Sequence, residues 1–209
     1  MLIRRASMRS GRAARGFSLI EALITLFVFA IGILTIAGLQ LISKKANYDA
    51  AQRTTAAMLV NDIAERMRAN LSTNGVALGD YLVEDVGGGT IAQPGQDCTA
   101  GTCTNAQLAA WDLYEWEQLL DGASEDNAGG LVEPSACIRS DVVGGGVGAY
   151  HIVIAWRGVT PLSNPVIDQN LTAAIAKGCG EGSDKYVDDD TGAANVYRRV
   201  ILVSTFITP

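Results

Sequence analysis

The feature that most constrains this chain is an apolar run near its N-terminus, from Phe17 to Ile42. The run contains no proline, and a helix of that length, rising about 1.5 Å per residue, spans the roughly 30 Å hydrocarbon core of a bilayer. Only five of its side chains carry polar atoms: Ser18, Glu21, Thr25, Thr35 and Gln40. Five arginines and no acid precede it: Arg4, Arg5, Arg9, Arg12 and Arg15. Because basic residues keep the adjoining end of a span in the cytoplasm, we expect a single-pass helix with a cytoplasmic N-terminus and a periplasmic remainder.

Two details distinguish this segment from a secretory signal, which has an apolar core of roughly 7–15 residues followed by small residues at the cleavage site. Here the small residue, Gly16, precedes the apolar run. The second detail is Glu21, because an unpaired carboxylate in an apolar helix costs a few kcal/mol in lipid and therefore suggests a functional partner. A plain membrane anchor, with Glu21 reaching back to the interface, is the alternative.

Residues 16–40, GFSLIEALITLFVFAIGILTIAGLQ, resemble the class III signal of type IV prepilins and pseudopilins. In that family a prepilin peptidase cleaves after the glycine on the cytoplasmic side and methylates the new N-terminal residue. The resemblance implies cleavage between Gly16 and Phe17 and N-methylation of Phe17. It also implies an assembly role for Glu21, which matches the glutamate at the fifth position of processed pilins.

The resemblance extends into residues 38–70, which are similar to the PilV subfamily of minor pilins, the type IV pilus modification proteins. The most specific part is the phrase DIAERMRAN, residues 62–70. Residues 98–120 and the segment ending at Trp156 are also similar to that group. This implies a low-abundance structural subunit that helps to initiate pilus assembly at or near the tip. The implied partners are other minor pilins, the major pilin, inner-membrane lipid and the pilus assembly platform, and the implied location is the inner membrane and then the pilus at the cell surface.

The charge distribution argues against a nucleic-acid partner. The formal net charge is −6, but five of the 16 basic residues lie in residues 1–16. The rest of the chain therefore has 11 basic against 22 acidic residues, a formal charge of −11. Neutralisation of phosphates requires a basic face, which such a composition does not favour.

Four cysteines, Cys98, Cys103, Cys137 and Cys179, lie in the part expected to be exported. An even count in an oxidising compartment predicts disulfides, with three connectivities. Four residues separate Cys98 from Cys103, so closing that loop costs little chain entropy, and we expect Cys98–Cys103 and Cys137–Cys179. The alternative is a zinc site, but the spacing of the first pair is wider than C-x2-C, and the single histidine, His151, lies in a strand-like run.

The helical pattern continues beyond the apolar run. An apolar stripe at three- and four-residue steps comprises Tyr48, Ala51, Thr55, Met58, Leu59, Ile63 and Met67. We therefore expect one continuous helix of about 54 residues, ending near Asn70. This divides the chain into a leader (1–16), a membrane and assembly helix (17–42), an amphipathic half of the same helix (43–70) and a periplasmic globular head (71–209).

A second helix is expected from Thr104, since Thr104 and Gln107 fit a capping box and Gly122 fits a C-terminal cap. Its two tryptophans, Trp111 and Trp116, are expected in the core and not in ligand stacking. Residues 71–103 and 123–135 are expected to be irregular.

Strands are expected at 136–143 and 147–156, as a hairpin around Gly144–Gly146, and at 197–207. The last is apolar on both faces in its middle, which predicts an interior position in the sheet. Residues 157–195 are expected to be a loop with a helical turn at 171–177. Four aspartates in it, Asp184, Asp188, Asp189 and Asp190, lack EF-hand spacing and are expected to be solvated.

Together these elements predict an α+β, pilin-like lollipop: a long N-terminal helix packed on a small antiparallel sheet, with a disulfide-held loop. No catalytic motif is present, so we expect no enzyme activity, cofactor or metal. The alternatives to a minor pilin are a minor pseudopilin of a type II secretion system, which shares the N-terminal motif, and a membrane-tethered periplasmic enzyme or sensor. Neighbouring genes distinguish the first alternative, and retention of the leader distinguishes the second.

Overall fold

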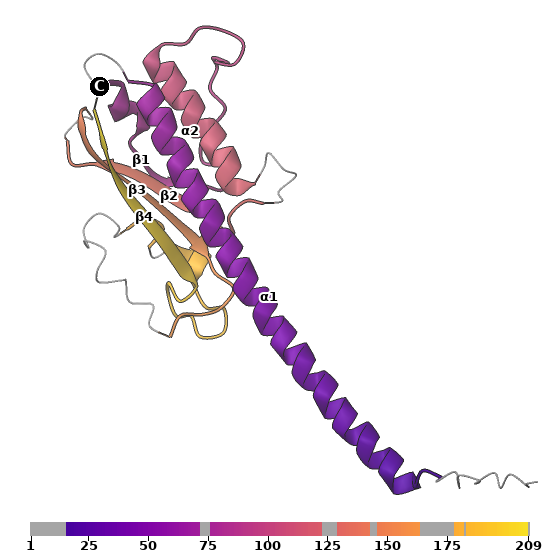
Figure 1. The fold of residues 1–209 in the computed structure, drawn as a ribbon. Coiled ribbons are helices and arrows are strands. Elements are labelled where there is room, and N and C mark those ends of the chain that lie inside the picture. Colours follow the sequence, from indigo (N-terminus) through magenta and orange to yellow (C-terminus); the bar gives the residue numbers. More distant parts are fainter. Residues whose placement is uncertain are drawn as a thin grey trace, which may run out of the picture. The chain divides into compact units, whose positions relative to one another are not determined.

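A computed structural model of the chain describes residues 16–71, 76–122, 129–142, 146–163, 178–181 and 183–208. The chain divides into two compact units, one ending at Lys44 and one running from Lys45 to Pro209, which we call the head. The first helix, α1, covers Leu19–Ala69 and contributes to both units (Figure 1). Its 51 residues and its end beside Asn70 agree with the predicted continuous helix.

The buried face of α1 differs from the predicted stripe. Within the head the buried residues are Gln52, Ala56, Leu59, Val60, Ile63, Ala64 and Met67. Three members of the predicted stripe, Tyr48, Ala51 and Met58, are exposed. The reason is helix periodicity: at about 3.6 residues per turn Ala56, Val60 and Ile63 fall on the same face, and Met58 falls on the opposite one.

The second helix, α2, covers Asn105–Asp121 and has the predicted caps. The Thr104 side chain accepts a hydrogen bond from the backbone N–H of Gln107, and the Gln107 side chain accepts one from that of Thr104. Gly122 adopts the left-handed conformation (φ 73°) that favours glycine at a helix C-terminus. Trp116 is fully buried and Trp111 nearly so, which agrees with the expected packing role.

Four antiparallel strands form the sheet in the order β1-β2-β3-β4: Val83–Val86, Ser135–Ser140, Gly148–Arg157 and Arg198–Ile207 (Figure 1). The predicted hairpin is therefore present as β2 and β3, although residues 143–145 at its turn lie outside the described part. On one face Ile138, Ile152 and Ile154 join the core that α1 and α2 cover. The amphipathic half of the helix is thus packed on a small antiparallel sheet, as expected.

The predicted interior position of the last strand is wrong, because β4 lies at an edge of the described sheet. Its two apolar faces have another cause. Ile201 and Val203 pack against the main core, whereas Val200 and Leu202 pack on the opposite face against Cys137, Val153 and Cys179. A second small apolar cluster therefore explains why β4 has apolar residues on both faces, and a central position in the sheet is not needed.

The segment predicted to be irregular between α1 and α2 contains two elements that the sequence did not reveal. A 3-10 helix, η1, covers Val76–Tyr81, and β1 follows it at the other edge of the sheet. β1 is only four residues long and includes two acids, so it lacks a recognisable alternation. A further 3-10 helix, η3, covers Asp184–Tyr186. The helical turn expected at 171–177 lies outside the described residues.

Candidate processing and assembly site

The predicted cleavage junction lies in exposed, non-helical backbone just before α1. Gly16 and Phe17 precede the first helical residue, Leu19, and the Phe17 side chain is 84% exposed. A Cβ placed on Gly16 would meet no described atom within 4 Å. Glu21 lies in the first turn of α1, where a negative charge is favoured by the helix dipole. Gly16 and Phe17 thus lie in non-helical backbone directly before the helical turn that contains Glu21.

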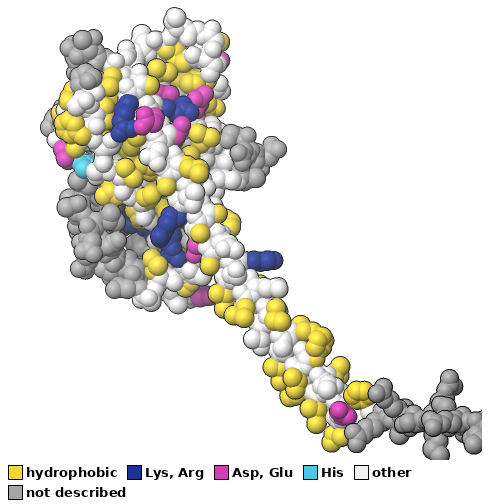
Figure 2. Space-filling model, viewed as in Figure 1, with side chains coloured by type: hydrophobic (Ala, Val, Ile, Leu, Met, Phe, Trp, Pro, Cys, Tyr) yellow, Lys and Arg dark blue, Asp and Glu magenta, His cyan; other side chains and the backbone are white. Residues whose placement is uncertain are grey.

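The following part of α1 presents apolar side chains that its own chain does not cover. It is long and apolar enough to cross a membrane by length and composition, and none of the most apolar window is buried (Figure 2). The hydroxyls of Thr25 and Thr35 donate to the helix carbonyls of Ala22 and Ile31, at 2.9 and 3.0 Å. The Glu21 carboxylate has no hydrogen-bond donor among the described residues.

A polar network joins the second half of α1 to α2. The Arg66 guanidinium lies 2.9 Å from Asp62, 3.2 Å from Asp112 and 2.7 Å from Glu115. Burial alone lowers the pKa of Arg66, but the hydrogen bond that it donates to Glu115 and the charges of Asp62 and Asp112 outweigh this effect, so the pKa lies above its ordinary value. Tyr81 donates to Asp112, and burial followed by that carboxylate raises the pKa of Tyr81.

The same network closes the end of α1. Asn70 donates to the Tyr81 hydroxyl at 3.1 Å and to the carbonyl of Asn105 at 2.8 Å, and Asn105 donates back to its Oδ1 at 2.9 Å. Two polar residues of the phrase DIAERMRAN, Arg66 and Asn70, thus hold α1 to the rest of the head, and a third, Asp62, pairs with Arg66 within the helix. The sequence indicated only the Asp62–Arg66 pair, which is local in the helix.

Buried polar groups on α1 and α2 also fix two loops. Gln52 donates to the carbonyl of Gly130 at 3.0 Å and accepts from the N–H of Val132 at 3.1 Å. Glu117 is fully buried and accepts from the backbone N–H groups of Gly87, Thr90 and Ile91. Sequence reasoning did not find these two roles, because a Gln or Glu within a helix is normally expected to face solvent. No basic residue lies near Glu117 in the sequence to suggest a buried ion pair.

The disulfides of the structure join Cys98 to Cys103 and Cys137 to Cys179. The first closes the loop before α2, and the second links β2 to residues 178–181 on the far face of the sheet. His151 is nearly buried, with its Nδ1 2.7 Å from the Ser204 hydroxyl and its Nε2 3.2 Å from Asp141. In the described residues no group of three or more His, Cys, Asp or Glu side chains could hold a metal ion.

Comparison with known families agrees with the motif and the fold. The family model for the type IV pilin Tt1218 matches residues 38–114, and that for the prokaryotic N-terminal methylation motif matches residues 11–37. No curated protein and no solved structure shows a significant match. The methylation motif implies processing by a prepilin peptidase, and the apolar helix behind it implies the inner membrane and then the pilus. The pilins are structural subunits and not enzymes. With a methylation motif, an exposed apolar helix and an α+β head, this chain is a protein of the type IV pilin family.

Proposed function

We propose that this chain is a minor pilin, most similar to the PilV subfamily, that helps to initiate pilus assembly at or near the tip. The observation that carries the proposal is Glu21: a carboxylate one turn into an uncovered apolar helix, directly behind a methylation motif, with no donor from the described chain. The network around Arg66, built from the phrase that resembles PilV, supports the subfamily assignment.

Processing prepares Glu21 for this role. Cleavage between Gly16 and Phe17 gives Phe17 a positively charged α-amino group at the start of the helix. Glu21 lies four residues further, about one turn, so it pairs with this terminus or with that of a neighbouring subunit. In lipid the unpaired carboxylate is penalised, and docking beside the terminus of an adjacent pilin relieves the penalty. Glu21 therefore favours assembly more than folding of the head.

In this proposal residues 1–16 are the cytoplasmic leader, 17–42 the membrane and assembly helix, 43–70 its amphipathic half and 71–209 the periplasmic globular part, which forms the head together with that amphipathic half. The five arginines of the leader set this orientation. The partners are the prepilin peptidase, the assembly platform, other minor pilins and the major pilin. The alternative, a minor pseudopilin of a type II secretion system, has the same N-terminal motif; deletion of the gene would then abolish secretion and leave surface pili intact.

The experiment compares strains that carry only Glu21→Ala, Glu21→Gln or Gln40→Ala. Gln40 is the matched control, because it is the other long polar side chain of the apolar run. We expect the Glu21→Ala protein to be cleaved, stable and membrane-bound but poorly recovered with other pilins, with fewer surface pili. Glu21→Gln should be partly defective, since it keeps hydrogen bonding and loses charge. Normal piliation and co-purification of Glu21→Ala would refute Glu21 as an assembly contact.

A further inference from the structure

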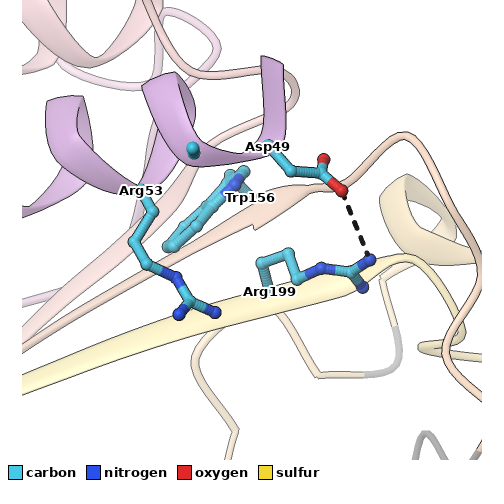
Figure 3. Close-up of a pocket in the computed structure, with 5 residues that line it drawn as sticks. Asp49, Arg53, Trp156 and Arg199 are labelled. Atoms are coloured by element: carbon cyan, nitrogen blue, oxygen red, sulfur yellow. Dashed lines mark ion pairs between the residues drawn. The ribbon is translucent and has the colours of Figure 1, made fainter. Parts of the chain in front are cut away.

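A pocket in the head combines two guanidinium groups with a tryptophan, at the end where α1 enters this unit. Asp49, Ala50 and Arg53 of α1 line it, together with Trp156 near the end of β3 and Arg199 near the start of β4, around a volume of about 300 Å³. Figure 3 shows the indole ring of Trp156 between the side chains of Arg53 and Arg199. All five residues belong to the head.

Two buried donors of this pocket have no acceptor among the described residues: Trp156 Nε1 and Arg199 Nη1. The other tryptophans contrast with this, because Trp111 Nε1 donates to Glu115 and Trp116 Nε1 to the carbonyl of Leu59, both at 2.9 Å. Trp156 is only 1% exposed, so its N–H cannot turn to bulk water. A buried donor without an acceptor is costly, and an acceptor brought by a ligand would remove that cost.

Contacts with the surrounding backbone fix the position of the Arg199 guanidinium. Its Nη2 donates to the carbonyl of Thr160 at 2.7 Å, which leaves Nη1 as the group without an acceptor. A Cβ on Gly158 would lie 2.8 Å from the carbon of the guanidinium, so the backbone passes directly beside this group and a larger residue would displace it. Asp49 lies 4.0 Å from Arg199 and accepts from the N–H of Val159 at 3.1 Å.

The charges of the pocket specify a monoanion. Two guanidinium groups, those of Arg53 and Arg199, face one carboxylate, that of Asp49, which leaves a formal charge of +1. Guanidinium and indole N–H groups are donors only, so the ligand must be an acceptor. A phosphodiester carries one negative charge and acceptor oxygens that two arginines bind well.

The surroundings of the pocket indicate where such a group comes from. Asp49 follows the last residue of the apolar run, Ile42, by seven residues, or about 10 Å along a helix. The loop behind β3 exposes two apolar side chains, Val159 and Leu162, and its Val159 N–H and Thr160 carbonyl contact the pocket residues. Arginine and exposed apolar side chains together are typical of the boundary between water and lipid headgroups.

We propose that this pocket binds the phosphodiester of a phospholipid headgroup in the periplasmic leaflet. The exposed Arg53 pairs with the phosphate oxygens at the mouth of the pocket. A shift of the Arg199 and Trp156 side chains then lets Arg199 Nη1 and Trp156 Nε1, which are buried without a ligand, donate to the same group, while Val159 and Leu162 lie against the lipid. The contact holds the head on the membrane until the subunit leaves the bilayer. A carboxylate of a neighbouring pilin would suit the same charges, but it does not account for the apolar loop beside the pocket.

The test uses the full-length processed protein in dodecyl maltoside micelles, with tryptophan labelled by 15N. The chain has three tryptophans, and the Trp156→Phe variant identifies which of the three indole resonances belongs to Trp156. The ligand is dihexanoyl phosphatidylglycerol; dihexanoylglycerol, inorganic phosphate and acetate are titrated in parallel. We expect a saturable shift of the Trp156 resonance with the phospholipid, no shift with dihexanoylglycerol, and at most weak responses to phosphate and acetate.

The variant Arg53→Gln alters an exposed residue, so the fold is kept, and it should weaken phospholipid binding about tenfold. Lys45→Gln is the matched control: it removes one charge from the same helix outside the pocket and should change the affinity by about twofold or less. Equal affinity for inorganic phosphate would refute a lipid source, and equal affinity for acetate would favour a neighbouring carboxylate. No shift with any anion, or equal losses in Arg53→Gln and Lys45→Gln, would overturn the site.

Discussion

Replacing Glu117 by glutamine tests whether a buried carboxylate, paired only with hydrogen-bond donors, holds the head together. Its Oε1 accepts from the Gly87 N–H at 3.0 Å and from both the N–H and the hydroxyl of Thr90 at 2.6 Å. Its Oε2 accepts from the Ile91 N–H at 2.7 Å. The side chain has no solvent exposure, so water cannot replace a lost acceptor. Glutamine keeps the shape and supplies one acceptor oxygen instead of two.

The expected loss follows from these contacts. With the amide oxygen at the Oε1 position, three hydrogen bonds remain and one donor, the Ile91 N–H, faces the amide NH2. A lost hydrogen bond to a charged acceptor costs about 1.5–3 kcal/mol, and an unpaired buried donor costs a similar amount. We therefore expect the free energy of unfolding of the head to fall by about 3 kcal/mol. For a unit of this size that lowers Tm by about 6–12 °C.

The assay is thermal unfolding of the full-length processed protein in detergent, followed by near-ultraviolet circular dichroism, which reports the environment of the buried Trp116. Glu65→Gln is the matched control: the same chemical change at an exposed residue paired with Arg68 should cost less than about 1 kcal/mol. If Glu117→Gln costs no more than this control, the loop at residues 87–91 does not depend on the carboxylate, and the reasoning fails.

Three further predictions follow from the junction, the disulfides and the buried tyrosines. The intact mass of the mature protein should show loss of residues 1–16 and one added methyl group on Phe17; a mature N-terminus within 37–43 would contradict the class III motif. Non-reducing peptide mapping should recover the Cys98–Cys103 and Cys137–Cys179 pairs, and a Cys98–Cys137 peptide would refute this pairing. In the chain-entropy model, removing the second disulfide, whose cysteines are 42 residues apart, should lower the free energy of unfolding by about 4 kcal/mol, and removing the first should lower it by about 2 kcal/mol. Burial raises the pKa of Tyr81 and Tyr186, so their contribution to stability is present below the ordinary tyrosine pKa of about 10 and is lost as pH rises above it. An absorbance titration should show that Tyr81 and Tyr186 ionise only when the head unfolds, and ionisation of these two in the folded protein near pH 10 would contradict this.

The helices could be predicted because their signals are local. The capping box at Thr104, the glycine at 122 and the proline-free stretch of α1 each act within a few residues of the chain. The hairpin of β2 and β3 was also predictable, since an apolar alternation on both sides of three glycines favours adjacent antiparallel strands. The N-terminal methylation motif was recognisable because its signal also lies within a few consecutive residues.

Other features depend on contacts between distant residues. The edge position of β4 could not be predicted, because the far face of the sheet carries its own apolar cluster around the Cys137–Cys179 disulfide. The roles of Gln52 and Glu117 depend on loops that lie 78 and about 30 residues away. Short β1, with two acids in four residues, is a strand because β2 offers it an edge.

The uncovered apolar part of α1 has a consequence for the energetics of transfer from the bilayer to the filament. The head has its own core, and none of the most apolar window of the helix is buried by the chain, so the helix can change surroundings without refolding of the head. Lipid tails and neighbouring apolar helices are similar solvents for such a surface, so the hydrophobic effect hardly distinguishes bilayer from filament. Moving such a helix from the bilayer to the filament therefore changes its hydrophobic free energy very little. Whether the helix moves from the bilayer to the filament is then decided by small differences in its polar contacts and by the assembly machinery.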